Sequence, residues 1–344
     1  MKYSFKNDYS EGAHPRILNK LIATNLQQQH GYGEDQYSEE AKAILKHKIN
    51  QPEAAIHFVS GGTQSNLLVI SSLLRIHEAV ISAQTGHIFT HETGAIEAVG
   101  HRVITANTSN GKLCPEDLRA VLRAYQLRPH TVKPKMVYIS NSTEMGTIYS
   151  KAELRELSLF CREHHLLLFM DGARLGHALT AANNDLSLTD IAQWTDVFYI
   201  GGTKNGALLG EAIVFNNPQL APDFDYVLKQ KGALLAKGRL LGIQFLELFK
   251  EDLYFDLAKQ ANIMAAKIAE AVNKLGFSLL TEATTNQIFP ILPKGVISQL
   301  SEKYLFYEWQ DMDENHAAIR LITSWATEED IVNEFIRDLT AAKG

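Results

Sequence analysis

The sequence predicts an α/β fold in which helices cover both faces of a mostly parallel sheet, followed by a smaller α+β domain. From about residue 54 to residue 216, short apolar segments alternate with amphipathic ones. After Phe224 the pattern changes to long helical periodicity, which short apolar segments follow. Alternating strands and helices favour a parallel sheet, because each connecting helix packs on one of its faces.

The apolar periodicity of the first part predicts its strands and helices. Strands are expected at 54–60, 79–83, 101–107, 135–142, 166–172, 195–202 and 211–216. Helices are expected at 63–79, 115–127 and 151–164. Together with an N-terminal arm, this part forms the expected large domain of residues 1–240.

The second part begins with helical periodicity that continues to Lys274. Strands are expected at 276–280, 286–293, 303–309 and 317–325, and a closing helix starts at Thr327. We expect residues 241–344 to form the small C-terminal domain.

The composition excludes several classes of protein. The chain has 344 residues, of which 45% are hydrophobic and 21% charged, as in ordinary globular proteins. Its net charge is -6 and it has no run of Lys or Arg, so nucleic acid is not an expected partner. Cys114 and Cys161 are too few for a disulfide framework and indicate a reducing compartment, the cytoplasm. No apolar run approaches the roughly 20 residues that cross a bilayer, so no membrane association is expected.

Lys204 follows an apolar strand in the sequence Gly-Gly-Thr-Lys-Asn-Gly. Ligands of open parallel sheets bind at the carboxyl ends of the strands. Partial desolvation there lowers the pKa of a lysine and frees a neutral amine that can form an imine. A solvated loop lysine is the simpler explanation of Lys204 taken alone.

Asp171 ends the apolar run LLLFM and favours the imine hypothesis. A carboxylate buried without a partner costs several kcal/mol. A protonated pyridine nitrogen would supply that partner, and pyridoxal phosphate needs this pairing to accept electrons. Asp171 could instead cap a helix that starts at Ala173.

A third strand end carries the turn Gly61-Gly62-Thr63, which leads into an amphipathic helix. The backbone N–H groups of such a turn and the helix N-terminus form an anion site that suits a phosphate. Helix capping alone also explains the composition of the turn.

These elements, in this order, resemble the low-specificity threonine aldolase and aromatic amino acid β-eliminating lyase family of fold-type I pyridoxal phosphate enzymes. The motifs are GYGEDQY (31–37), FVSGGTQSN (58–66), GHIFTHETGA (86–95), NSTEMG (141–146), MDGARLGHA (170–178), GGTKNG (201–206) and AIRLITSW (318–325).

For the cofactor, the resemblance implies that Lys204 forms the Schiff base and that Asp171 binds the pyridine nitrogen. The phosphate would bind Gly61, Gly62, Thr63 and Thr203. The ring would lie under His87 and near Arg174, and Arg239 would reach the phosphate of a neighbouring subunit.

For the substrate, the resemblance implies that Arg320 and Arg174 lie near the carboxylate. A buried guanidinium in the apolar strand around Arg320 also needs an anion on physical grounds. The implied substrate site further includes Asn7, Tyr9 and Tyr32. At Asn7 and Tyr9 the sequence departs from the family's small polar residues.

The implied reaction is retro-aldol cleavage of a β-hydroxy-α-amino acid of the threonine, allo-threonine or phenylserine type to glycine and an aldehyde. Lys204 and Asp171 would be catalytic, and His87 or His130 would take the proton of the β-hydroxyl. Elimination or transamination on the same scaffold, or a catalytically silent cofactor-binding protein, remains an alternative. A homodimer or homotetramer is implied, and no metal site is expected.

Overall fold

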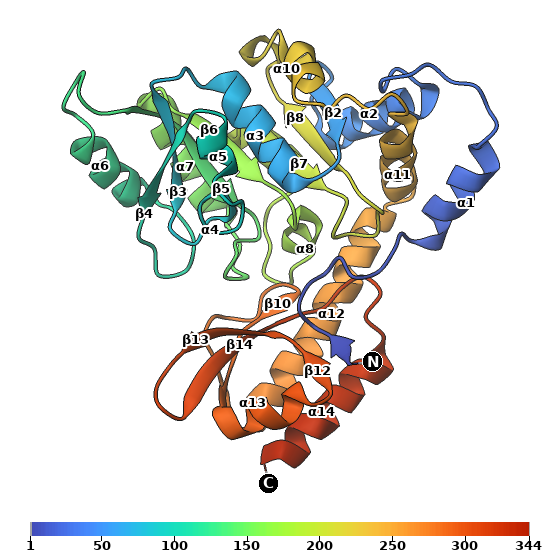
Figure 1. The fold of residues 1–344 in the computed structure, drawn as a ribbon, viewed down its shortest axis with the longest axis vertical. Coiled ribbons are helices and arrows are strands. Elements are labelled where there is room, and N and C mark those ends of the chain that lie inside the picture. Colours follow the sequence, from blue (N-terminus) through green and yellow to red (C-terminus); the bar gives the residue numbers. More distant parts are fainter. Residues whose placement is uncertain (1, 344) are drawn as a thin grey trace.

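The chain is described here by a computed structural model, which covers residues 2–343, and its architecture confirms the predicted fold class (Figure 1). Within these residues, the large sheet has seven strands in the order β2-β8-β7-β6-β5-β3-β4. The strands are β2 (Ala55–Val59), β3 (Glu78–Ala83), β4 (Arg102–Ala106), β5 (Lys133–Ser140), β6 (Leu167–Asp171), β7 (Val197–Gly201) and β8 (Glu211–Phe215).

Successive residues of a strand point to opposite faces of the sheet, and in these strands the residues on both faces are largely apolar. The helices of the large part therefore cover both faces. One face packs against α3 (Gly62–Leu73), α4 (His87–Thr90), α5 (Ala95–Ala98) and α10 (Phe224–Gln230). The other packs against α1 (Pro15–Thr24), α2 (Gln36–Ile49), α6 (Pro115–Ala124), α7 (Lys151–Glu163), α8 (Leu175–Leu179), α9 (Leu188–Trp194) and α11 (Arg239–Phe249). In β7, for example, Phe198 and Ile200 pack on the second face, and Val197 and Tyr199 on the first.

The strand directions bring the predicted functional segments to one edge. Strands β3, β4, β5, β6 and β7 are parallel, and β8 is antiparallel to both β7 and β2. The carboxyl ends of β2, β5, β6 and β7 therefore meet the amino end of β8. The expected helix 63–79 is wrong at its end, since α3 stops at Leu73 and β3 begins at Glu78. The apolar residues that follow Glu78 pair within the sheet instead of continuing the helix.

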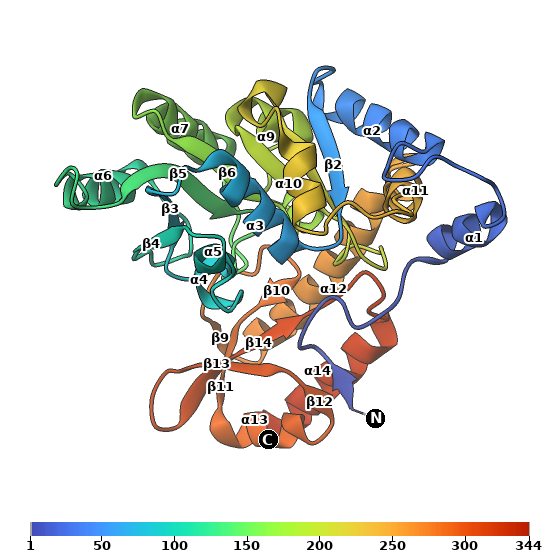
Figure 2. The same ribbon diagram turned by 45° about the horizontal axis from the view of Figure 1, so that its top comes forward.

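The small C-terminal part has its own sheet, which Figure 2 shows below the large one. Its elements are β9 (Ser278–Leu279), β10 (Gln287–Ile288), β11 (Pro290–Pro293), α13 (Lys294–Ser301), β12 (Tyr304–Leu305), β13 (Tyr307–Asp311), β14 (His316–Ile322) and α14 (Glu329–Lys343). The long helix α12 (Leu253–Lys274) extends from the large part into the small one (Figure 1).

Two contacts cross the expected domain boundary at residue 240. Helix α11 starts at Arg239 and extends past this boundary, but it packs on α2 and α1 of the large part. The N-terminal strand β1 (Tyr3–Ser4) pairs with β12, so the start of the chain packs with its end. The remaining described element is a short 3-10 turn, η1 (Pro218–Leu220). Within residues 2–343, no helix is long and apolar enough to cross a membrane.

A close backbone approach fixes β6 against β7 at the functional edge. A Cβ atom at Gly172 would lie 1.8 Å from the carbonyl oxygen of Tyr199, and the Gly201 N–H donates to the Gly172 carbonyl at 2.9 Å. Only glycine allows this spacing, because backbone cannot yield as a flexible side chain can.

We therefore expect Gly172→Ala to lower the free energy of unfolding by at least about 1–3 kcal/mol, because the added methyl group forces β6 and β7 apart. Urea unfolding followed by circular dichroism measures this. Gly295→Ala in α13 is the matched control, since a Cβ there meets nothing within 4 Å. Equal stability of the two variants would contradict the role of the close approach.

Candidate active site

A cavity of about 280 Å³ lies where these strand ends meet. Its walls include residues from the ends of β2, β5, β6 and β7 and from the start of β8. Of the residues expected from the sequence, the cavity brings together Tyr9, Gly61, Gly62, Thr63, His87, Asp171, Arg174, Thr203 and Lys204.

Asp171 is a buried carboxylate, 4% exposed, at the end of β6. Tyr138 of β5 and Tyr199 of β7 lie on the same face of the sheet, and the Tyr138 hydroxyl donates to Asp171. Burial alone would raise the pKa of Asp171, but the nearby His87 and hydrogen bonds from the two tyrosines outweigh it. The pKa lies below its usual value, so the side chain is held as an anion. It also accepts the Ala173 N–H at 2.9 Å, but helix α8 begins only at Leu175 with Arg174 before it, so Asp171 supports the turn and does not cap a helix at Ala173.

Lys204 lies in the turn after β7 and lines the cavity. Burial, and next the positive charge of Arg174, lower the pKa of Lys204 below its usual value. The carboxylates of Asp8, Asp171 and Glu211 act in the opposite direction. A lowered pKa gives the neutral amine a larger share, which is the form that attacks a carbonyl.

The glycine turn meets the requirements of a phosphate site. Helix α3 begins at Gly62, and no side chain within residues 2–343 caps its first turn. A Cβ at Gly61 would meet nothing within 4 Å, so the backbone borders open space. Free N–H groups and the helix dipole therefore face the cavity together. Thr203 lines it too, and its hydroxyl accepts the Gly210 N–H at 2.9 Å.

His87 starts α4, and the buried carboxylate of Glu92 holds its ring in place. Its Nδ1 lies 2.8 Å from Oε1 of Glu92, which is 6% exposed. Asn66 of α3 donates to the same oxygen at 2.7 Å and lies 3.4 Å from Asp171. The ring of His87 is stacked with that of His91 at 5.5 Å. These contacts hold the imidazole at the cavity wall.

Arg174 forms a bidentate ion pair with Asp8 of the N-terminal arm. The two bonds measure 2.7 and 3.0 Å; the Asp8 side chain is fully buried and that of Arg174 is 12% exposed. Asn286 of the C-terminal part donates to the same carboxylate at 2.9 Å. Burial alone would raise the pKa of Asp8, but Arg174 and next Lys204 outweigh it and hold the pKa well below its usual range.

Arg320 of β14 is not among the residues that line the cavity, but the charges of Arg174 and Asp8 act on it. Its guanidinium carbon lies 5.2 Å from the ring centre of Tyr307 and 4.9 Å from that of Trp309. Its Nε is buried and has no hydrogen-bond partner within residues 2–343. Burial, and next the charge of Arg174, lower the pKa of Arg320 to about 10, so it remains a cation at neutral pH.

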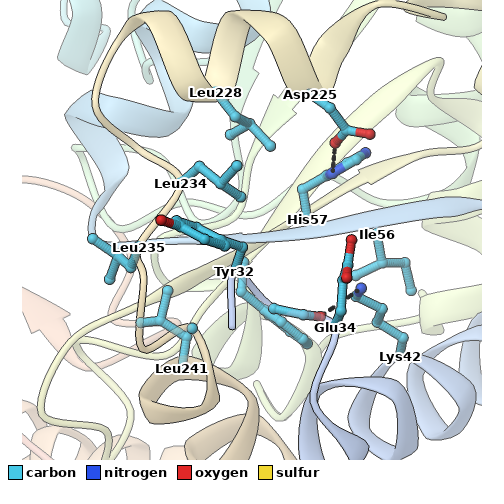
Figure 3. A pocket seen from close by; sticks show the side chains of 13 residues that line it. Tyr32, Glu34, Lys42, Ile56, His57, Asp225, Leu228, Leu234, Leu235 and Leu241 are labelled. Carbon is cyan, nitrogen blue, oxygen red and sulfur yellow. Dashed lines mark hydrogen bonds and ion pairs between the residues drawn. The ribbon is translucent and has the colours of Figure 1, made fainter. Parts of the chain in front are cut away.

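Four residues expected in the site lie elsewhere in the structure. His130 is exposed and precedes β5, so it lies at the amino end of that strand and not at the carboxyl end. Tyr32 lines a different pocket, next to the His57–Asp225 pair and Leu234 (Figure 3).

The other two are Asn7 and Arg239. Asn7 accepts the Tyr9 N–H at 3.0 Å and so shapes the turn that carries Asp8 and Tyr9. Arg239 donates to the Gln27 carbonyl at 2.6 Å, at the surface beside α1. Neither side chain lines the cavity.

Several residues of the site were missed by the sequence interpretation. They are Asp8, Asn66, Glu92, Tyr138, Glu144, Tyr199 and Glu211. Glu144 and Glu211 were the ones with a usable signal, since Glu144 follows a predicted strand and Glu211 begins one. Burial raises the pKa of Glu211 to about 8, although Lys204 acts against it.

A lysine with a lowered pKa, an ionised aspartate and a helix N-terminus without a side-chain cap lie around one cavity, which is the arrangement of an enzyme that binds pyridoxal phosphate through an imine. The comparisons with known proteins agree. Residues 10–293 match the model of the β-eliminating lyase family, to which this chain therefore belongs.

Individual relatives cover the whole chain. It is 33% identical to the low-specificity L-threonine aldolase of Pseudomonas aeruginosa over 99% of this chain and 98% of that one. The solved structure of Leishmania major threonine aldolase is 46% identical, covers 99% of this chain and 100% of that one, and has a TM-score of 0.97. Aspartate aminotransferase from Thermus thermophilus, at 13% identity and a TM-score of 0.73, shares the fold, with coverage of 99% and 91%.

The Asp8–Arg174 pair makes a specific contribution to stability. We expect Asp8→Asn to lower the free energy of unfolding at neutral pH by about 3–5 kcal/mol, because it leaves a buried guanidinium without its counter-ion. Asp8 has a depressed pKa in the folded chain, so its contribution is complete above the unfolded value of about 3.9 and is lost as the pH falls further.

Urea unfolding at several pH values measures the difference in the free energy of unfolding between wild type and Asp8→Asn, which should shrink below about pH 4. Asp311→Asn, which removes an exposed ion pair with Lys294, is the control and should change stability far less. A constant difference between wild type and Asp8→Asn across this range would contradict the assignment.

Proposed function

We propose that this protein cleaves β-hydroxy-α-amino acids of the threonine type to glycine and an aldehyde, with pyridoxal phosphate bound to Lys204. The observation that carries the proposal is that Lys204 and the ionised Asp171 line one cavity beside a free helix N-terminus. The names of the relatives from Pseudomonas aeruginosa and Leishmania major support the choice of reaction.

The residues present fit the cofactor. Lys204 would hold it covalently, Asp171 would keep the pyridine nitrogen protonated, and the N-terminus of α3 would bind its phosphate. When bound, the protonated ring supplies an electron acceptor for the bond that breaks at the substrate Cα. His87 would lie against the ring, where Glu92 orients it.

Two arginines would serve the substrate. In the part of the chain that the structure describes, Nε of Arg320 has no hydrogen-bond partner, so Arg320 would bind the carboxylate, which orients the Cα–Cβ bond for cleavage. Arg174 is already paired with Asp8, so its role would be to shape the substrate side of the cavity and to add positive charge. Tyr9 lies over Lys204, whose Nζ is 6.0 Å from the ring centre, and would border the entrance.

The deciding experiment is a product panel with threonine, allo-threonine, phenylserine and serine. Glycine with an aldehyde supports the proposal, pyruvate with ammonia supports elimination, and neither product with bound cofactor supports a silent homologue. Borohydride reduction followed by peptide mapping should place the reduced cofactor on Lys204. Its recovery on another lysine would overturn the site.

The Arg320 assignment has its own test. We expect Arg320→Lys to lower kcat/KM for amino acids at least about tenfold, equivalent to ~1.4 kcal/mol, because lysine keeps the charge and loses the planar fork. Cofactor binding, measured by absorbance, should persist. Arg337→Lys on the exposed face of α14 is the control. Normal processing of amino acids by Arg320→Lys would move the carboxylate site to Arg174 or the Asn7 turn.

We further propose that the protein is a homodimer or a homotetramer, joined through the face around α1. Leu18 and Ile22 of α1 and Leu26 just beyond it are 40%, 75% and 93% exposed, at intervals of four residues. Figure 1 shows α1 at the outer edge of the molecule. A contiguous exposed apolar patch is typical of an association surface. Arg239 lies beside this patch, where a contact with the neighbouring subunit is expected. A cytoplasmic location remains a prediction from the sequence.

Light scattering tests the assembly. The double variant Ile22→Glu, Leu26→Glu should dissociate at concentrations where the wild type is associated, because charges replace the apolar contacts. Ile76→Glu, at another site that is 85% exposed, is the control and should leave the mass unchanged. A monomeric wild type with full activity would contradict the proposal.

A further inference from the structure

Aldol cleavage requires a base at the β-hydroxyl of the substrate. The β-hydroxyl loses its proton as its O–H electrons form the carbonyl and the Cα–Cβ bond breaks. The pair from that bond stays with Cα, which later receives a proton and becomes glycine. A group at the cavity wall must therefore take one proton from oxygen.

Most other ionisable groups of the cavity have partners or positions that suit other roles. His87 is bound through Nδ1 to Glu92 and would lie against the cofactor ring, so its Nε2 is the competing base, and Asp171 accepts the Tyr138 hydroxyl. Glu211 is paired in the sheet with Val59 and Gly201, which places it between the glycine turn and the Lys204 turn, on the phosphate side. His130 lies at the opposite end of β5.

We propose that Glu144 is the catalytic base that takes the proton of the substrate β-hydroxyl, an inference that rests on the proposed aldol cleavage. Glu144 lines the cavity from the loop after β5 and is 9% exposed. Its Oε1 accepts the Ser140 hydroxyl at 2.8 Å and the His87 N–H at 3.1 Å. Within residues 2–343, Oε2 accepts no hydrogen bond from another residue, so it is free for a ligand.

The loop that carries Glu144 is held in place on both sides. The Thr143 N–H donates to the Thr147 carbonyl at 2.9 Å, and the Gly146 N–H donates to the Thr143 carbonyl at 3.0 Å. Gln287 of the C-terminal part donates to the same Thr143 carbonyl at 3.0 Å. A base fixed in this way does not lose conformational freedom when the substrate binds.

The surroundings of Glu144 raise the proton affinity of its carboxylate. Burial, and next the negative charge of Asp171, raise the pKa of Glu144, while the Ser140 hydroxyl and His87 act in the opposite direction. The ionisable groups that face it are Asp171 and Arg174 from the end of β6, His87 from α4, Tyr138 from β5 and Tyr149 from the loop before α7. A raised pKa makes the carboxylate a stronger base.

The test compares Glu144→Gln, Glu144→Asp and the control Glu163→Gln, which changes an exposed residue at the end of α7. Glutamine keeps the acceptor at Oε1 and removes the basic oxygen. We expect kcat/KM for cleavage of phenylserine to fall at least about 100-fold in Glu144→Gln, because one general base typically contributes this much. Glu144→Asp should recover part of the rate.

Two measurements separate a base from a structural residue. Binding of glycine, followed by the change in the absorption band of the cofactor, and exchange of its α-proton with solvent need no base at the β-oxygen. Both should stay within about threefold of wild type in Glu144→Gln. In wild type, kcat/KM should fall as the pH drops through the raised pKa of Glu144, because only the carboxylate accepts a proton, and this limb should be absent from Glu144→Gln.

The possible results distinguish the role of Glu144 from the proposed reaction. Loss of cleavage with normal glycine exchange supports Glu144 as the base. Equal cleavage by Glu144→Gln and wild type, or equal loss of cleavage and exchange, overturns the inference and leaves the proposed reaction standing. If the wild type binds and exchanges glycine but cleaves no β-hydroxy amino acid, the proposed function fails, and the inference fails with it.

Discussion

Keeping Asp171 ionised inside the protein is the constraint on which the arrangement of this site depends. An unsolvated carboxylate is costly, so each neighbouring element has to contribute a donor or a positive charge. Strand β5 contributes Tyr138, β7 contributes Tyr199, and the turn after β6 contributes a backbone N–H. These donors reach one carboxylate because the three strands are adjacent and the tyrosines lie on the same face. The close packing at Gly172 holds that spacing.

A second buried ion pair connects parts of the chain that the sequence separates widely. Asp8 belongs to the N-terminal arm, Arg174 follows β6, and Asn286 belongs to the C-terminal part. The arm is held at its other end by the pairing of β1 with β12. The N-terminal arm and the C-terminal part are therefore joined at the residue that follows one strand end of the large sheet.

The sequence predicted those features that depend on local patterns. The alternation of apolar segments indicated the parallel sheet, and the rule that ligands bind at strand ends brought Asp171, Lys204 and the glycine turn to one crevice. The sequence did not predict the roles of residues that depend on long-range contacts. Asp8 and Glu92 acquire their roles only through Arg174 and His87.

Assignments that rest on motif similarity alone stay predictions. Within this chain His130 lies at the amino end of β5, and Tyr32 lines another pocket. Glu144 follows a predicted strand, but this position alone does not distinguish it from the other polar residues of its loop. Its role depends on the N–H of His87, which is 57 positions away in the chain.

The charges around the cavity explain how so many carboxylates coexist there. Asp8 is balanced by Arg174, Glu92 is bound by His87, and Asp171 would pair with the ring nitrogen of the cofactor. Glu211 differs from these because burial raises its pKa to about 8, although the charge of Lys204 acts against the rise. Its pairing with Val59 places it beside the glycine turn, where the protonated form can donate a hydrogen bond to an anion.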